Sequence, residues 1–370
     1  MKSKNKIWKD HFPALRKSIY LNTGSEGLIP RDTFYLMQRL IKRNFKYGGS
    51  HPDYFAYMNM YYRKLREAFS ELGRDIDGMI RVASTSEGMN FSFNMHRWKK
   101  GDRVVIRKDE FKTVILAALV ARQRFDIEIL WADDIKDFIE IIRREKPAAA
   151  ACSHVDYRSG EILPVEEIYS VCAEHTFFIC DGAQAFGNIF WKIPEKIHAD
   201  MYVFTTHKWG ISPRGLGFVI PAGKQDRTAP VSAHYFSTSE WKVPDNMSFT
   251  GEISDYSNHF NNFLGEAGFV SSYRFLKKKG FERIETLKKK VKDAFLEGFR
   301  ESGIEVINRD SQLLSFIPGD HDPDKFVSDM QRHGILLRTI PDTPYVRISP
   351  HFYNTESNAE IFFRKMRKLG

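Results

Sequence analysis

The sequence predicts an α/β protein, with a large domain of mostly parallel sheet covered by helices and a small C-terminal α/β domain. In the middle of the chain, short apolar runs typical of strands alternate with segments of helical periodicity. After about residue 265 this alternation gives way to one long amphipathic helix and pairs of short strands. The 370 residues are 42% hydrophobic, which is enough for two domains with a large core.

The alternation of strands and helices can be followed in order along the chain. Apolar runs predict buried strands at 104–106, 127–130, 148–153, 177–180 and 202–205. Apolar residues at helical spacing predict helices at 89–97, 113–122, 135–142 and 165–172. Repeated strand–helix units of this kind imply a mostly parallel sheet with helices on both faces.

The C-terminal part has a different pattern. Ile284, Leu287, Val291, Phe295 and Phe299 lie on one side of a long predicted helix. Short strands are expected near 305–308, 313–317, 335–340 and 345–349. We therefore expect three parts, namely an N-terminal segment (1–20) that packs on the small domain, a large domain (21–265) and a small domain (266–370).

Charge and composition exclude several classes of protein. Lys plus Arg minus Asp plus Glu is 56 − 47 = +9, but the lysine runs 277–279 and 288–290 fall in predicted helices, and no nucleic-acid-binding module accompanies them. We interpret these runs as solvated helix faces and expect no nucleic-acid partner. No apolar run approaches the ~20 residues of a membrane helix, and the N-terminus lacks the apolar segment of an export signal.

Cysteine usage and metal-ligand spacing give two further expectations. The three cysteines show no CxxC spacing, which favours a reducing compartment, so we expect a cytoplasmic protein. His321-Asp322-Pro323-Asp324 is interpreted as a turn, and no other cluster has metal-ligand spacing. No metal site is predicted.

Two polar residues follow predicted strands where ligands commonly bind. Asp181 ends the strand at 177–180, and the carboxyl edge of an open α/β sheet is a usual ligand site. By itself this aspartate is a helix cap, a turn former or a functional acid. Lys208 follows the strand at 202–205. A lysine there is either solvated or, if buried, a Schiff-base nucleophile with a lowered pKa.

Six motifs in order resemble those of the class V aminotransferases and cysteine desulfurases, fold type I enzymes that use pyridoxal phosphate. The resemblance extends from about Tyr20 to Glu356 and so covers most of the chain. The motifs are Tyr20-Leu-Asn-Thr-Gly24, Ser84-Thr-Ser-Glu-Gly-Met-Asn90, Ser153-His-Val155, Asp181-Gly-Ala-Gln184, Thr205-Thr-His-Lys208 with Pro213-Arg-Gly-Leu-Gly217, and Val346-Arg-Ile-Ser-Pro350.

The resemblance implies roles for the residues around the cofactor ring. Lys208 would hold pyridoxal phosphate as a Schiff base and then move the α-proton of the substrate. Asp181 would pair with the pyridine nitrogen, which makes the ring an electron sink. Gln184 would donate a hydrogen bond to the ring hydroxyl oxygen. Phe111 would stack on the ring, although a core phenylalanine is the other interpretation.

The resemblance also implies a phosphate site. Thr85 and Ser86 precede a predicted helix and match the phosphate loop of the family, and their other interpretation is N-capping, which uses the same geometry. Thr205 and His207 fall at two further phosphate positions. Gly251 matches a glycine that reaches the phosphate of the partner subunit, and a homodimer is therefore implied.

Two residues match positions that bind the substrate carboxylate. Arg347 would bind it bidentately, with a surface ion pair as the alternative. Asn22 lies near the carboxylate position in the family, with an Asx turn as the alternative.

Two departures from the family pattern bear on the reaction. Persulfide-forming members carry a cysteine in the loop that here is Arg338-Thr-Ile-Pro-Asp-Thr-Pro344, and this loop has none. At Thr250-Gly251-Glu252 many relatives have Gly-Thr, so Glu252 brings a negative charge close to the expected phosphate contact.

We therefore interpret the chain as a pyridoxal-phosphate-dependent enzyme that acts on the α-carbon of an amino acid, by aminotransferase, epimerase or C–S lyase-type chemistry. One alternative is an enzyme similar to cysteine desulfurases or selenocysteine lyases that lacks the persulfide cysteine. The other alternative is a non-catalytic basic binding protein on the same fold.

Overall fold

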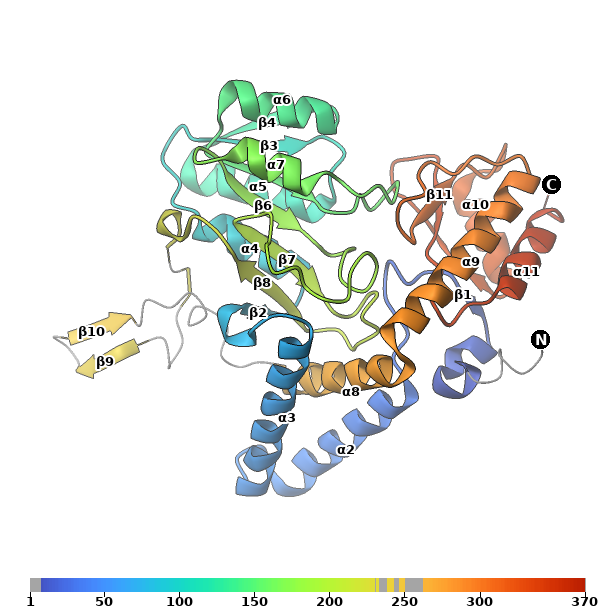
Figure 1. Cartoon of the computed structure of the whole chain (residues 1–370), viewed down its shortest axis with the longest axis horizontal. Coiled ribbons are helices and arrows are strands. Elements are labelled where there is room, and N and C mark those ends of the chain that lie inside the picture. Colours follow the sequence, from blue (N-terminus) through green and yellow to red (C-terminus); the bar gives the residue numbers. More distant parts are fainter. Residues whose placement is uncertain (1–7, 230, 233–237, 243–245, 250–261, 370) are drawn as a thin grey trace.

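The computed structural model describes residues 8–229, 231–232, 238–242, 246–249 and 262–369. These residues form a large domain around a seven-stranded sheet and a small domain that contains the C-terminal helices (Figure 1). Two long helices, α2 (Arg31–Tyr47) and α3 (Pro52–Glu71), extend away from the sheet. The expected α/β fold class is confirmed.

The large sheet has the order β2-β8-β7-β6-β5-β3-β4. The five neighbouring strands β4, β3, β5, β6 and β7 are parallel. At the other side of the sheet, β8 pairs antiparallel with β7, and β2 pairs antiparallel with β8. The sheet is therefore mostly parallel, as expected. Its strands are β2 (Ile80–Val82), β3 (Arg103–Arg107), β4 (Glu128–Ala132), β5 (Ala149–Ser153), β6 (Phe177–Asp181), β7 (Met201–Thr205) and β8 (Gly217–Pro221).

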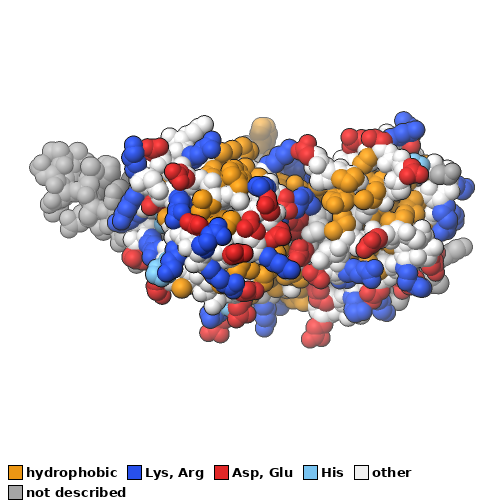
Figure 2. Space-filling view, turned by 90° about the horizontal axis from the view of Figure 1, so that it is seen from above, with side chains coloured by type: hydrophobic (Ala, Val, Ile, Leu, Met, Phe, Trp, Pro, Cys, Tyr) orange, Lys and Arg blue, Asp and Glu red, His pale blue; other side chains and the backbone are white. Residues whose placement is uncertain are grey.

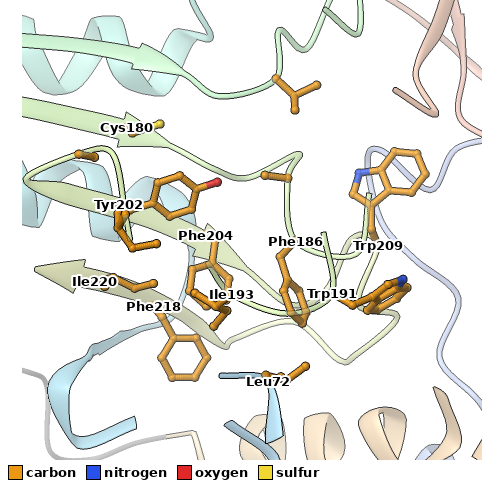
Figure 3. Packing of buried hydrophobic residues seen from close by; sticks show 14 of the residues in the cluster. Leu72, Cys180, Phe186, Trp191, Ile193, Tyr202, Phe204, Trp209, Phe218 and Ile220 are labelled. Carbon is orange, nitrogen blue, oxygen red and sulfur yellow. The ribbon is translucent and has the colours of Figure 1, made fainter. Parts of the chain in front are cut away.

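Helices cover both faces of this sheet, and successive residues of a strand face opposite cores. Val104 and Ile106 belong to the core under α4 (Thr85–Met95) and α5 (Lys112–Phe125). Val105, between them, belongs to the core under α6 (Ile135–Glu145) and α7 (Val165–Cys172). Figure 3 shows part of this second core, where aromatic side chains gather beside the end of the sheet. The labelled rings are Phe186, Trp191, Tyr202, Phe204, Trp209 and Phe218.

The small domain packs three helices on a three-stranded sheet of order β11-β14-β13. The rings of Phe295, Phe299, Phe316 and Phe362 fill its core. Its elements are α9 (Phe281–Glu301), β11 (Leu314–Phe316), α10 (Pro323–Arg332), β12 (Ile335–Leu336), β13 (Arg338–Thr339), β14 (Val346–Ile348) and α11 (Glu356–Met366). Near the N-terminus, β1 (Ile19–Tyr20) pairs in parallel with β12.

The remaining elements connect these parts. Helix α8 (Phe263–Lys279) packs against α2 and α3, and β9 (Thr238–Lys242) pairs with β10 (Asn246–Phe249). The described residues also include the short 3₁₀ helices η1 (Pro13–Arg16), η2 (Ile76–Gly78) and η3 (Gln225–Arg227). In the described part of the chain, none of the helices combines the length and apolar character needed to cross a bilayer.

Three expectations differ in detail from the structure. The helix expected at 89–97 begins at Thr85, because Ser84 caps it by accepting a hydrogen bond from the backbone N–H of Glu87. The strand expected near 305–308 is a single bridge between Val306 and Phe316. The turn expected at 321–324 is the start of α10, where Asp322 is the N-cap.

On the face shown in Figure 2, Lys and Arg side chains are interspersed with Asp and Glu. Many basic residues are paired, as in Lys289 with Asp293 along one turn of α9. The interpretation of the lysine runs as solvated helix faces holds for the exposed residues Lys277, Lys278, Lys289 and Lys290. It is wrong for Lys288, which is buried, because its Nζ donates to the carbonyls of Gly187 and Asn188 (both 2.9 Å).

Candidate active site

The carboxyl ends of β6 and β7 bring Asp181 and Lys208 to one edge of the large sheet. Asp181 is the last residue of β6 and lies opposite Val203 of β7. Lys208 follows three residues after the end of β7. Because the two strands are parallel neighbours, both side chains lie at the edge where open α/β sheets bind ligands.

Asp181 is buried, with 3% of its surface exposed. Burial raises the pKa of its carboxyl, while the nearby positive charge of Lys208 opposes this shift. Its Oδ1 accepts a hydrogen bond of 2.8 Å from the backbone N–H of Ala183. Asp181 therefore stabilises the turn that follows β6, which is one of the roles expected from the sequence. Among the described residues Oδ2 accepts no hydrogen bond, so it is available to a cationic partner.

Lys208 is not a solvated lysine. Desolvation lowers the pKa of its ammonium to about 8; Asp181 opposes the shift, and Arg347 and Arg338 reinforce it. Within the described part of the chain Nζ makes no hydrogen bond or ion pair, and it lies 6.0 Å from the ring centre of Phe111. A partly buried amine with a lowered pKa and no described partner at Nζ has the properties of a Schiff-base lysine.

The backbone behind Lys208 is tightly fixed. Ile211 closes a turn with its N–H on the carbonyl of Lys208 (3.1 Å) and has φ of +49°, which is rare for a β-branched residue. Gly27 donates its N–H to the carbonyl of His207 (2.8 Å). A Cβ at Gly27 would lie 2.0 Å from the carbonyl oxygen of Lys208, so only glycine fits there. Strain held by packing of this kind is common at functional sites.

Gln184 is held by two hydrogen bonds that fix its amide orientation. Its Oε1 accepts from the indole Nε1 of Trp209 (2.8 Å), and its Nε2 donates to the carbonyl of Gly24 (2.8 Å). One Nε2 hydrogen remains for a further acceptor, which is the capacity expected for a bond to the ring hydroxyl oxygen.

Two helix N-termini meet at the expected phosphate site. Thr85 and Ser86 form the first turn of α4, while the capping hydroxyl is that of Ser84. The Ser86 hydroxyl lies 3.0 Å from that of Thr113 in the first turn of α5. The first turns of both helices therefore lie next to each other, an arrangement suited to a phosphate.

Thr205 and His207 are neighbours at this end of the site. The hydroxyl of Thr205 lies 2.6 Å from Nδ1 of His207. Desolvation and then the charge of Lys208 lower the pKa of His207 to about 4, so its imidazole is neutral and can donate one hydrogen bond. Gly251 and Glu252 lie outside the described residues.

Arg347 is buried and poorly satisfied. It is 1% exposed, its Nη1 donates to the carbonyl of Tyr157 (2.6 Å), and its Nε has no partner among the described residues. Desolvation, reinforced by Arg338, lowers the pKa of the Arg347 guanidinium to about 9. The surface ion pair considered above is wrong, because Arg347 is buried and pairs with no described carboxylate. A buried guanidinium of this kind fits an anionic ligand.

Phe111 and Asn22 border the same space. The backbone N–H of Phe111 is held by the buried carboxyl of Glu110 (2.9 Å), and its half-buried ring meets the ring of Tyr157 edge to face at 5.0 Å. Asn22 Oδ1 accepts from the hydroxyl of Ser25 (2.7 Å), so this side chain already has a turn role.

Sequence reasoning missed four residues of this site, namely Arg338, Tyr157, Thr113 and Trp209. In the sequence, Arg338 is part of a loop without cysteine, and its place opposite Arg347 depends on the pairing of β13 with β14. Trp209 stands next to Lys208, and that adjacency was the one available signal for it. Tyr157 and Thr113 reach the site through loops and helix ends whose geometry periodicity does not reveal.

The side chains fit pyridoxal phosphate. Within the described residues Lys208 Nζ and Asp181 Oδ2 have no hydrogen-bond partner, and the first turns of α4 and α5 form a corner suited to a phosphate. Arg347 adds an unsatisfied cation for a substrate carboxylate.

Comparisons with known proteins agree with this site. A model of the family described as aminotransferase class-V matches residues 51–362, which is most of the chain. A probable cysteine desulfurase of Pyrococcus abyssi is 23% identical, and the match covers 96% of this chain and 95% of that protein.

Two solved structures have the same fold. The apo structure of a cysteine desulfurase from Thermococcus onnurineus NA1 has a TM-score of 0.85 at 21% identity, and the match covers 98% of this chain and 97% of that one. The complex of the cystine C-S lyase C-DES with its product, cysteine persulfide, has a TM-score of 0.85 at 19% identity. That match covers 96% of this chain and 98% of the other.

The fold is that of the fold type I enzymes that use pyridoxal phosphate, as the sequence predicted. The chain belongs to the class V aminotransferase family and is a pyridoxal-phosphate-dependent enzyme. The alternative of a non-catalytic binding protein is not favoured.

Proposed function

We propose that this enzyme removes the α-proton of an amino acid with Lys208 and then releases a sulfur-containing group in a C–S lyase-type elimination. The observation that supports the first step best is Lys208 itself. Its Nζ is free among the described residues, its pKa is lowered to about 8, and it lies under the influence of both Asp181 and Arg347. These are the properties of a base that works near neutral pH beside a bound carboxylate.

The residues divide the work between them. Arg347 binds the α-carboxylate and so orients the Cα–H bond toward Lys208, which takes the proton. Asp181 would pair with the ring nitrogen of pyridoxal phosphate and keep it protonated. When bound, pyridoxal phosphate supplies the electron sink that stabilises negative charge at the α-carbon. Gln184 would donate its remaining Nε2 hydrogen to the ring hydroxyl oxygen, and the ring of Phe111 would cover the face of the cofactor ring.

The phosphate is assigned to the corner where α4 and α5 begin. Thr85, Ser86, Thr205 and His207 supply hydroxyl and imidazole groups, and the helix N-termini supply N–H groups. Gly251 is proposed as a contact across a homodimer. Exposed apolar side chains on α2, among them Phe45 with 93% of its surface exposed, support a covered face in such a dimer.

The state of the cysteines supports elimination over enzyme-bound persulfide chemistry. Cys152, Cys172 and Cys180 are the only cysteines, and all three are free and buried. Burial raises the pKa of each thiol, for Cys172 to about 12. No thiolate is therefore present to accept sulfur, so the sulfur leaves with the product. Unpaired thiols also support the expected cytoplasmic setting.

The elimination has a simple balance. A cysteine S-substituted with R, plus one water, gives the thiol RSH, pyruvate and ammonium. The Cβ–S bond breaks, its electron pair leaves with sulfur, and the proton removed by Lys208 comes from Cα. No oxidant or reductant is required.

Product analysis of the holoenzyme with a thioether amino acid tests this function. We expect pyruvate and thiol in equal amounts. A transaminated keto acid that keeps its sulfur would indicate an aminotransferase, and a racemised amino acid would indicate an epimerase. Either result would contradict the elimination while leaving the α-proton step in place.

A further inference from the structure

The antiparallel register of the small domain sets two arginines face to face. Arg338 of β13 lies directly opposite Arg347 of β14. Opposite residues of neighbouring strands project from the same face of a sheet. Ser315 of β11 lies opposite Arg347 on the other side, and its hydroxyl donates to the carbonyl of Arg158. The face that carries both arginines is therefore turned toward the large domain and the active site.

Both guanidinium groups are bound only by neutral acceptors in the described part of the chain. Arg347 donates from Nη1 to the carbonyl of Tyr157. Arg338 donates from Nε to the carbonyl of Thr339 (3.0 Å) and from Nη1 to the hydroxyl of Ser25 (3.2 Å). Neither makes an ion pair with a described residue, although Arg347 is buried and Arg338 is partly buried. The Nε of Arg347 has no hydrogen-bond partner among the residues that the structure describes.

Carboxylates close to this pair already have partners. Asp156 pairs with Arg107, and it also accepts from the backbone N–H groups of Arg158 and Ser159. Asp109 pairs with Arg158 and Arg107.

The buried Glu110 accepts from Ser153 and from the backbone of Phe111. Arg107 and Arg158 are thus balanced by acids, whereas Arg338 and Arg347 are not.

Two like charges placed opposite each other, one buried and one partly buried, destabilise the protein unless anions neutralise them. Each arginine lowers the pKa of Lys208, and Arg338 lowers that of Arg347, so the repulsion reaches the whole site. One α-carboxylate brings a single negative charge, which leaves one guanidinium unbalanced. A second anionic group on the same ligand completes the balance.

We propose that Arg338 is a specificity-determining residue and that the substrate is an amino acid whose side chain carries a second carboxylate. Arg347 binds the α-carboxylate and Arg338 binds the side-chain carboxylate. This inference rests on the proposed function, because it takes the amino acid to be held at Lys208 with its α-carboxylate on Arg347. In the elimination the second carboxylate belongs to the leaving group R, which departs as an acidic thiol.

Pairs of acids and their amides test the proposal. The holoenzyme is titrated with S-carboxymethyl-L-cysteine and with S-carbamoylmethyl-L-cysteine, which has nearly the same shape without the charge. The pair L-glutamate and L-glutamine repeats the comparison without a thioether. The readouts are the dissociation constant from the visible spectrum of the cofactor and the shift of the unfolding midpoint. We expect the acid of each pair to bind about 10- to 100-fold more tightly than its amide, as for a charge-assisted hydrogen bond.

Three variants assign this preference to Arg338. In Arg338→Met we expect the acid-to-amide ratio to fall to within a few-fold of one, mainly through weaker binding of the acid. Arg338→Lys keeps the charge and should restore part of the preference. Arg364→Met removes an exposed arginine of α11 and should leave the ratio unchanged.

The outcomes separate this inference from the proposed function. Equal binding of acid and amide by the wild-type holoenzyme would overturn the role of Arg338, because both arginines would then serve one carboxylate, while the proposed function would stand. Persistence of the preference in Arg338→Met would also overturn it. A holoenzyme whose spectrum responds to none of the four amino acids would contradict the proposed function and the inference together.

Discussion

Asp181 and Lys208 each oppose the effect that burial has on the pKa of the other. Burial raises the pKa of the Asp181 carboxyl and lowers that of the Lys208 ammonium, and each residue's charge partly reverses the shift of the other. This coupling follows from the topology, since their strands β6 and β7 are parallel neighbours that end at the same edge of the sheet. The site therefore holds an acid and an amine that are both poorly solvated and ready for charged partners.

Asp181→Asn separates the role of the charge from that of the turn. The asparagine oxygen can still accept from the N–H of Ala183, so the apoprotein should fold and should not be destabilised, because a costly buried charge is removed. Turnover of the holoenzyme should fall by about 100-fold or more, since the charge beside the ring nitrogen is lost. Steady-state kinetics with a thermal melt of the apoprotein measure both effects. Wild-type turnover in this variant would show that Asp181 serves only the turn.

The lowered pKa of Lys208 predicts how the stability of the apoprotein changes with pH. The unfolded chain keeps the lysine proton up to its ordinary pKa of 10.5, whereas the folded chain loses it at about 8. Between these values the unfolded state binds more protons, so this group makes the folded state more stable as pH rises. Below pH 8 its burial costs up to about 3 kcal/mol.

Denaturant unfolding of the apoprotein and of Lys208→Met at pH 7 to 10 checks this prediction. The variant should be the more stable of the two at pH 7, and the difference should shrink as pH rises above 8. A difference that does not depend on pH would mean that Lys208 is solvated in the folded protein.

The sheet could be predicted from the sequence because apolar runs determine it. The strands expected at 104–106, 148–153 and 177–180 correspond to β3, β5 and β6, since buried parallel strands are nearly continuous in apolar residues. The bridge at Val306 could not be told from a strand, because its local composition is the same and only pairing with Phe316 limits it.

Some residues of the candidate site could likewise be predicted from the sequence, and others are brought together only by the folded structure. Lys208, Asp181 and Gln184 stand in contiguous motifs at strand ends, so sequence spacing places them together. Arg338 joins them only through the register of β13 with β14, and this register depends on tertiary packing. That Arg347 is buried without an acid is likewise a property of the folded chain, because strand alternation alone left a surface ion pair open.

Arg347→Gln tests the assignment of the α-carboxylate. Loss of a charge-assisted contact should raise KM for the amino acid about 10- to 100-fold, with a smaller effect on kcat. Arg364→Gln, an exposed substitution on α11, serves as the control for the change in net charge. The initial rate as a function of substrate concentration provides the measurement. Unchanged KM in Arg347→Gln would assign the carboxylate to another residue.

The burial of all three thiols predicts that the folded holoenzyme resists alkylation. With iodoacetamide near neutral pH we expect negligible labelling and unchanged turnover, because the pKa of each thiol is raised and its sulfur is covered. The denatured chain should take up three labels, which calibrates the mass measurement. Detection of a persulfide on any of the three cysteines after turnover would argue against release of sulfur with the product.

The central claim is that Lys208 holds the cofactor. The most direct test is to add pyridoxal phosphate to the purified protein, record the visible spectrum, reduce with borohydride and map the modified peptide by mass spectrometry. We predict a yellow protein whose reduced cofactor is attached to Lys208, and a Lys208→Ala variant that is folded but carries no such adduct. A reduced cofactor on another lysine, or an adduct that persists in Lys208→Ala, would contradict the account.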